Sequence, residues 1–104
     1  YAADGSWFLK SAWIELRKSK LDAVIFDATV GEIEDDRRIF EHNNLPMIRL
    51  MLGVFKKYGV FSQNSRVLLT HMASTLYPCC HEEIERKLSR EGIFPAYDGL
   101  YVRL

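Results

Sequence analysis

A chain of 104 residues with 48% apolar residues can bury one hydrophobic core, and its composition is that of a single folded domain over residues 1–104, not of a disordered chain. The formal net charge is +0, because 14 Lys and Arg residues balance 14 Asp and Glu residues. The sequence therefore lacks the basic excess that indicates binding to nucleic acid or to an acidic membrane surface.

The only cysteines, Cys79 and Cys80, are adjacent. A disulfide between neighbours is strained and closes no useful loop, so this pattern indicates a reducing compartment. The longest apolar runs, at residues 21–26 and 50–55, are far shorter than the about 20 residues that cross a bilayer. No basic-then-apolar leader is present. We therefore expect a cytoplasmic protein without a membrane segment.

An apolar segment and an amphipathic helix are predicted at the start of the chain. Residues 1–3 are apolar and are expected to form a short extended segment that ends at Asp4. The sequence from Ser6 to about residue 19 predicts a helix, because serine is a favoured N-cap and apolar residues recur at helical spacing. The residues expected on its inner face are Phe8, Ala12, and Leu16 or Trp13.

A strand and a long loop are predicted next. Residues 21–26 are apolar except for Asp22, which is typical of a strand covered on both faces. Residues 29–43 are predicted to form a loop, and its acidic run at residues 32–36 is expected to be solvated.

The best-defined element is a helix that begins after Asn44. Asn44 can cap this helix, Pro46 lies in its first turn, and Gly59 ends it. Two lysines near the end suit the negative pole of the helix dipole. The apolar residues expected on its inner face are Met47, Leu50, Met51, Val54 and Phe55.

The last third of the sequence predicts a strand, a helix and a hairpin. Residues 67–70 predict a second buried strand, and Pro78 precedes a helix with acidic residues early and basic residues late. Residues 93–97 and 101–104 flank Asp98-Gly99, a pair typical of a hairpin turn. The resulting order, β-α-β-α-β-α-ββ, indicates an α/β layered fold.

Candidate functional side chains follow the predicted strands. Asp4, Asp27 and His71 each come directly after an extended segment, and His42 lies just ahead of the best-defined helix. Because the carboxyl ends of strands in open α/β sheets meet at one edge, these carboxylates and imidazoles are expected there. Asp and His side chains with open coordination positions suit zinc, manganese or iron.

Each of these residues also has a structural interpretation. Asp4 suits a turn, and Asp27 could accept backbone hydrogen bonds in the turn that follows it. His42 could be a solvated loop residue and His71 a buried, hydrogen-bonded histidine. His81 follows two adjacent cysteines, but structural zinc sites space their cysteines further apart, so we expect His81 to be a first-turn residue of the third helix.

Five short motifs occur in order along nearly the whole chain. They are Tyr1-Ala-Ala-Asp-Gly5, Leu21-Asp-Ala-Val-Ile-Phe-Asp-Ala-Thr-Val-Gly31, Glu41-His-Asn-Asn44, Val67-Leu-Leu-Thr-His-Met72 and Ala96-Tyr-Asp-Gly99. In this register they resemble the C-terminal half of metallo-β-lactamase-fold hydrolases. The most similar branch contains the phosphoribosyl cyclic phosphodiesterase of the carbon–phosphorus lyase pathway. The resemblance implies half of an αββα sandwich.

The resemblance also implies roles for individual residues. Asp4 matches the aspartate that bridges two metal ions, although the family usually has Thr where this chain has Ala3. His71 matches the histidine that completes the ligands of the second metal. His42 matches the histidine that hydrogen-bonds the scissile phosphate and helps to protonate the leaving group. Asp27 matches a supporting position at a strand end that is not a direct ligand.

One part of the family pattern is missing. The family's His-x-His-x-Asp-His motif and one further histidine do not occur in these 104 residues. Asp4 and His71 alone leave both metals short of the three protein ligands that catalytic sites usually have. The resemblance thus implies a fragment of a dinuclear hydrolase, dependent on zinc or manganese and inactive without its other half. Its expected substrate is a small phosphodiester or a related ester.

The alternative prediction is a non-catalytic α/β module. Half of a two-sheet sandwich leaves an apolar sheet face uncovered, and large exposed apolar patches drive association. We therefore expect the chain to self-associate as a homo-oligomer.

Overall fold

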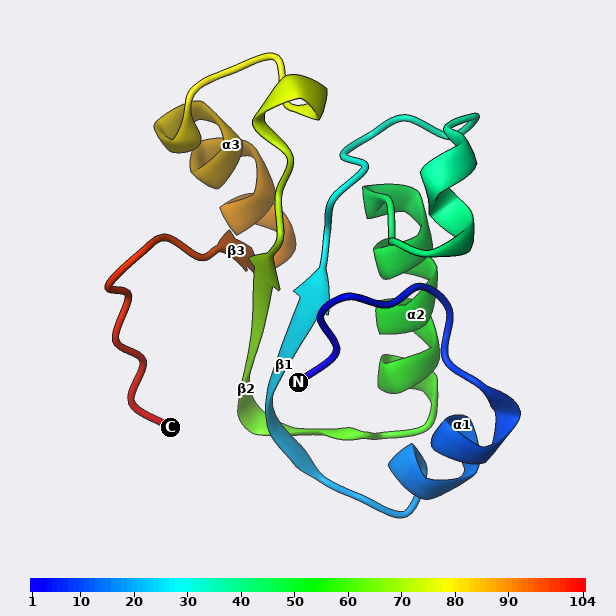
Figure 1. Cartoon of the computed structure of the whole chain (residues 1–104). Coiled ribbons are helices and arrows are strands. Elements are labelled where there is room, and N and C mark those ends of the chain that lie inside the picture. Colours follow the sequence, from blue (N-terminus) through cyan, green and yellow to red (C-terminus); the bar gives the residue numbers. More distant parts are fainter.

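A parallel sheet of three strands forms the centre of the structure. The computed structural model describes all 104 residues and shows an α/β domain with three α-helices. Strands β1 (Leu21–Asp27), β2 (Phe61–Thr70) and β3 (Ile93–Pro95) lie side by side in that order (Figure 1). The N-terminal segment adds an isolated parallel bridge between Ala2 and Phe26, beside β1. The order of these segments in space is therefore their order in the sequence.

The three helices pack on one face of this sheet. They are α1 (Lys10–Leu16), α2 (Leu45–Lys57) and α3 (His81–Leu88). Each helix connects neighbouring parallel segments, and every connection steps along the sheet in the same direction. Crossovers of the usual right hand then place all three helices on the same side. None of the helices combines the length and apolar character that crossing a membrane requires.

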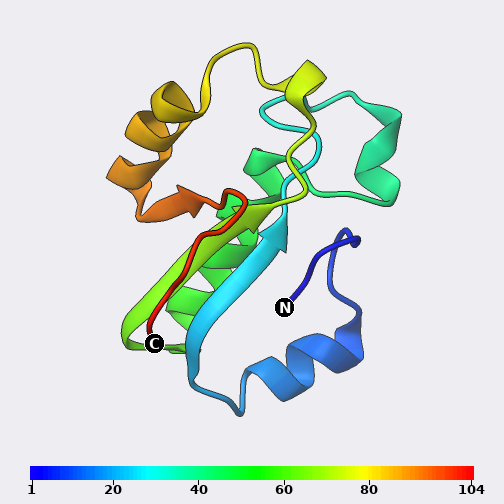
Figure 2. The same cartoon turned by 60° about the vertical axis from the view of Figure 1, so that its left-hand side comes forward.

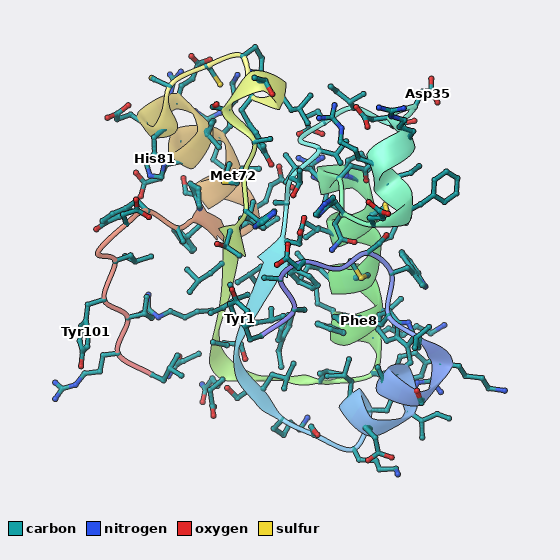
Figure 3. All side chains as sticks on the ribbon, in the orientation of Figure 1. Tyr1, Phe8, Asp35, Met72, His81 and Tyr101 are labelled. Carbon is teal, nitrogen blue, oxygen red and sulfur yellow. The ribbon has the colours of Figure 1, made fainter.

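One aromatic side chain, Phe55, lies at the centre of the core between helices and sheet. It is fully buried, and its ring stacks on Phe26 of β1 at 6.1 Å between centroids. Trp13 and Phe61 meet it edge-on at 5.5 Å and 5.4 Å. Phe8, which lies just ahead of α1 and is labelled in Figure 3, stacks on the Phe55 ring with centroids 6.2 Å apart. The fully buried residues packed in the same cluster include Phe26, Ile48, Met51 and Leu69.

Helix α2 begins and ends where its sequence predicts. Asn44 caps it, because its side-chain oxygen accepts a hydrogen bond from the Met47 backbone N–H at 2.8 Å. The predicted inner face was wrong in part. Leu50 is 64% exposed, and the buried residues of the helix are Leu45, Ile48, Met51, Leu52 and Phe55. Apolar residues occur around much of this helix, so its spacing alone did not fix which stripe faces the sheet.

The first helix is shorter than predicted. It begins at Lys10 instead of after Ser6, whose hydroxyl donates a hydrogen bond to the Ile39 carbonyl at 2.6 Å and caps nothing. Leu9 occupies the N-cap position without a side-chain hydrogen bond. Trp13 and Leu16 nevertheless pack against the core as the helical spacing predicts.

The connecting segments contain three short 3₁₀ turns. They are η1 (Arg37–Phe40), η2 (Ser74–Leu76) and η3 (Ser89–Glu91), and η1 interrupts the predicted loop at residues 29–43. Asp36 caps η1 by accepting a hydrogen bond from the Arg38 backbone at 2.8 Å. The Arg38 guanidinium beside the Asp36 carboxylate lowers the pKa of that carboxyl to about 2.

The C-terminal hairpin was predicted wrongly. Asp98 and Gly99 do form a turn, in which the Leu100 N–H donates to the Tyr97 carbonyl at 3.0 Å and Gly99 has a φ of 87°. Residues 101–104, however, form no strand. The preceding strand β3 pairs in parallel with β2, not antiparallel with the residues that follow it.

The C-terminal segment lies over the open face of the sheet. Figure 2 shows it crossing in front of β2, on the side away from α2. Leu100 and Val102 line a cavity there together with Leu68 of β2 and Phe94 of β3. Tyr101, at the rim of the same cavity, is 85% exposed (Figure 3). No helix covers this face. The prediction that the strands are covered on both faces is therefore wrong for β1, where Ile25 is only half-buried.

An exposed ion-pair cluster joins the acidic loop, α2 and η3, the 3₁₀ turn that follows α3. The Arg49 guanidinium donates to both carboxylate oxygens of Glu32 at 2.8 Å and to Glu91 at 2.7 and 2.9 Å. Hydrogen bonds to the two carboxylates raise the pKa of Arg49. The Arg49 guanidinium in turn lowers the pKa of Glu91 below its ordinary value of 4.5.

Replacing Arg49 by Met is expected to lower the free energy of unfolding at pH 7 by about 0.5–1 kcal/mol, the range of a well-formed exposed pair. Because the folded-state pKa of Glu91 is depressed, the stabilisation is present above pH 4.5 and is lost as pH falls below it. Urea unfolding of both proteins at pH 7 and pH 3 measures this. A difference that is as large at pH 3 as at pH 7 would rule out an electrostatic origin.

Candidate metal centre

Four ionisable side chains meet at the carboxyl edge of the sheet. Asp27 is the last residue of β1, and His71 follows the last residue of β2. Asp4 comes two residues after the Ala2 bridge, and His42 lies in the loop before α2. One ligand atom from each of the four lies within 4.8 Å of the other three. The structure thus brings together the three residues at the predicted segment ends and His42, which was expected ahead of the best-defined helix.

The buried carboxylate of Asp27 holds the ring of His42. Asp27 has no exposed surface, and its Oδ2 lies 2.8 Å from His42 Nδ1. A carboxylate only accepts hydrogen bonds, so Nδ1 is the nitrogen that donates to Asp27, and in the neutral ring Nε2 is the nitrogen with the free lone pair. The other carboxylate oxygen of Asp27 accepts from the Thr29 backbone N–H at 3.0 Å. Asp27 therefore stabilises the turn after β1 and also orients a histidine.

Asp4 and His71 form the exposed half of the cluster. His71 Nε2 lies 3.1 Å from Asp4 Oδ1, and the two side chains are 47% and 76% exposed. His71 is therefore not a buried structural histidine. Both residues have left-handed backbone conformations, with φ of 50° for Asp4 and 59° for His71. Such conformations are uncommon outside glycine and often occur at functional sites.

Thr29, for which the sequence predicted no role in the site, connects the two halves of the cluster. Its hydroxyl oxygen lies 2.9 Å from Asp27 Oδ1 and 2.9 Å from the His71 carbonyl oxygen. The rings of His42 and His71 stack nearly parallel, with centroids 5.4 Å apart and an angle of 16°. The only signal for Thr29 in the sequence was its position two residues after Asp27.

A cavity of about 510 Å³ opens beside His71. It lies at the end of β2, where Met72 is seen in Figure 3. The sequence predicted only a turn at Asp98, but in the structure Asp98 and Tyr97 line this cavity with His71. The remaining lining residues are Thr29, Thr70, Met72, Ala73 and Ala96. A small molecule with polar groups can therefore approach the cluster from this side.

The donor set fits one divalent cation. Two imidazoles and a carboxylate are the ligands that zinc and other first-row metals take, and three protein ligands leave a position for water or substrate. The cluster contains no further side chain that would hold a second ion. A dinuclear centre therefore needs ligands beyond those that these residues supply.

His81, Cys79 and Cys80 lie outside the cluster. His81 is the first residue of α3, as predicted, and meets the Tyr97 ring edge-on at 5.8 Å. Both cysteines are free thiols. The adjacent Cys-Cys-His sequence thus forms no metal-binding group with the other ionisable side chains.

No family model, no curated protein and no solved structure matches this chain. The α/β class and the four-residue cluster follow from the structure itself. The relation to metallo-β-lactamase-fold hydrolases stays a prediction from the five sequence motifs.

Proposed function

We propose that this chain is the C-terminal half of an αββα metallo-β-lactamase sandwich. In this proposal the intact protein is a dinuclear metal-dependent hydrolase, acting as a phosphodiesterase on a small phosphodiester or related ester. One observation carries the proposal: Asp4, His42 and His71, which the resemblance singles out and which lie far apart in the sequence, meet at one sheet edge. The placement of all helices on one sheet face is also the arrangement expected of half a sandwich.

The cluster would hold the metals with two of its residues. Asp4, with an exposed carboxylate, is suited to bridge two ions, and His71 Nε2 points at its carboxylate from 3.1 Å. The remaining ligands would come from the other half. Two bound divalent ions, zinc or manganese, would supply positive charge for the ester oxygens and lower the pKa of a water nucleophile.

His42 would provide the proton for the leaving group. Asp27 fixes Nδ1 as the protonated nitrogen and stabilises the imidazolium when Nε2 also takes a proton. The Asp27 carboxylate is fully buried, so the ring of His42 has one preferred orientation. Asp98 and Tyr97, on the cavity wall beside His71, would contact the part of the substrate that does not react.

A second candidate function is that of a self-associating α/β module without catalysis. The observation that favours it is the sheet face without helices, on which Ile25 is only half-buried and Phe94 is 36% exposed. A second copy that covers this face would remove apolar surface from water. Light scattering of the purified chain at high concentration tests this directly, and a uniform monomer would contradict it.

The coding sequence upstream of Tyr1 tests the enzyme proposal most cheaply. A His-x-His-x-Asp-His motif in the translated upstream region is the expected finding, because these side chains would supply the missing ligands. The absence of that motif from the full-length protein would refute the dinuclear hydrolase.

Metal content and activity of the full-length protein give the second test. With bis(p-nitrophenyl) phosphate as substrate, Asp4→Ala and His71→Ala are expected to lose both bound metal and hydrolysis. His42→Ala should keep its metal but lose about 10²–10⁴-fold in kcat, the usual contribution of a general acid. His81→Ala, at a histidine outside the cluster, is the matched control for metal content. Full metal content and activity in the Asp4 and His71 variants would disprove the assignment.

A further inference from the structure

One distance in the cluster is already that of a metal site, and the other ligand atoms lie within reach of the same point. Zinc binds nitrogen and oxygen ligands at 2.0–2.2 Å, so neighbouring ligand atoms around a tetrahedral ion lie about 3.3 Å apart. His71 Nε2 and Asp4 Oδ1 are separated by 3.1 Å, and all four candidate atoms lie within 4.8 Å of one another. Side-chain rotations, without backbone rearrangement, would bring them around one ion.

His42 has the environment of a metal ligand. Histidines that bind metals usually donate their other ring N–H to a carboxylate, which fixes the tautomer and raises the basicity of the ligating nitrogen. His42 Nδ1 makes this contact with the fully buried Asp27 at 2.8 Å, so Nε2 is the nitrogen left to bind. Asp27 already bonds Thr29 and His42, and it is therefore an outer partner and not a ligand.

Exposure divides the cluster in the way an open metal site requires. Asp27 is completely buried and His42 is 22% exposed, whereas His71 and Asp4 are 47% and 76% exposed. The buried Asp27 carboxylate thus lies behind the other three side chains. The exposed side chains of His71 and Asp4 face the solvent. Catalytic zinc sites have three protein ligands and one coordination position open to solvent, whereas structural zinc sites have all positions filled by protein ligands.

We infer that these 104 residues alone bind one divalent cation through His42, His71 and Asp4. No residue from another half is needed for this mononuclear site. His42 is then a metal ligand in this chain, and it is released for proton donation only when other side chains supply ligands. The inference rests on the proposed function in one respect, that this cluster takes a metal, and it differs in the role of His42.

Titration of the 104-residue chain with Co²⁺ tests the inference, with calorimetry for stoichiometry and visible absorption for coordination. The expected result is one ion per chain with the absorption of a four- or five-coordinate site. His42→Ala should weaken binding by more than about 100-fold, since even outer partners of ligands contribute about 10–100-fold. His81→Ala should bind as the unchanged chain does, and circular dichroism should show that each variant is folded.

Two outcomes would overturn the inference: no stoichiometric binding, or equal affinity in the His42→Ala and His81→Ala chains. If His42→Ala is unfolded, His42→Gln replaces it, because glutamine keeps much of the side-chain volume.

Failure of the proposed function looks different. A chain that binds one Co²⁺ through His42 while the full-length protein hydrolyses no phosphodiester supports this site and refutes the phosphodiesterase. The opposite outcome is a full-length enzyme whose kcat depends on His42, together with a 104-residue chain whose metal affinity does not change when His42 is replaced. That outcome supports the phosphodiesterase and refutes this metal site.

Discussion

Replacing Phe55 by Ala is expected to lower the free energy of unfolding by about 3–5 kcal/mol, the range for removing a buried aromatic ring. Phe55 is fully buried, and four other aromatic rings have centroids within 6.2 Å of it. Because these rings come from both the sheet and the helical layer, no single neighbour can move to fill the space. A domain whose total stability is about 5–15 kcal/mol would lose much of it.

Urea unfolding followed by circular dichroism measures this loss. Leu50→Ala is the matched control, since Leu50 lies in the same helix but is 64% exposed, and surface changes usually stay within about 0.5 kcal/mol. The predicted inner face of α2 contained both Leu50 and Phe55, so the pair also tests which stripe of the helix is buried. Equal losses for the two variants would mean that the core is not centred on Phe55.

Replacing Asp27 by Asn is expected to weaken metal binding at the cluster by about 10–100-fold, as for other outer partners of ligand histidines. The two side chains have the same shape, and an asparagine oxygen can still accept from the Thr29 backbone N–H. The amide nitrogen would then face His42 Nδ1 as a donor. His42 would have to move its proton to Nε2, where no lone pair would remain for a metal.

Two measurements separate this effect from simple destabilisation. Nitrogen NMR of the imidazole ring reports which nitrogen is protonated, and calorimetry with Zn²⁺ reports the affinity. Asp22→Asn, at an exposed carboxylate of the same strand that bonds Ser62, is expected to change neither. An unchanged His42 tautomer in Asp27→Asn, with unchanged affinity, would show that Asp27 does not orient the ring.

Local sequence signals predicted the elements that depend on local chemistry. Asn44, with Pro46 two residues later, marked the start of α2 because capping is an interaction of the helix with its own first turn. The strand ends at Asp27 and Thr70 lie within one residue of the predicted ends, since an apolar run gives way to polar residues there. The turn at Asp98-Gly99 is present because Gly99 adopts a positive φ without strain.

Elements that depend on distant partners were predicted less well. Residues 101–104 follow a turn as the second strand of a hairpin would, but in the structure they form no strand, and β3 pairs only with β2. Ser6 looked like a helix cap, yet its hydroxyl bonds the Ile39 carbonyl, 33 residues away. Leu50 fitted the helical stripe, and only the position of the sheet decided that it faces solvent.

For the candidate metal centre, the sequence by itself determined the residue types and placed Asp4, Asp27 and His71 at segment ends that share one edge of a parallel sheet. The tertiary structure decided which of them pair: Asp27 with His42, and Asp4 with His71. It also decided that Asp27 is buried while Asp4 is exposed. The physical reason is that spacing along the chain fixes which edge a side chain reaches, whereas burial and hydrogen-bond partners depend on segments that meet only after the chain has folded.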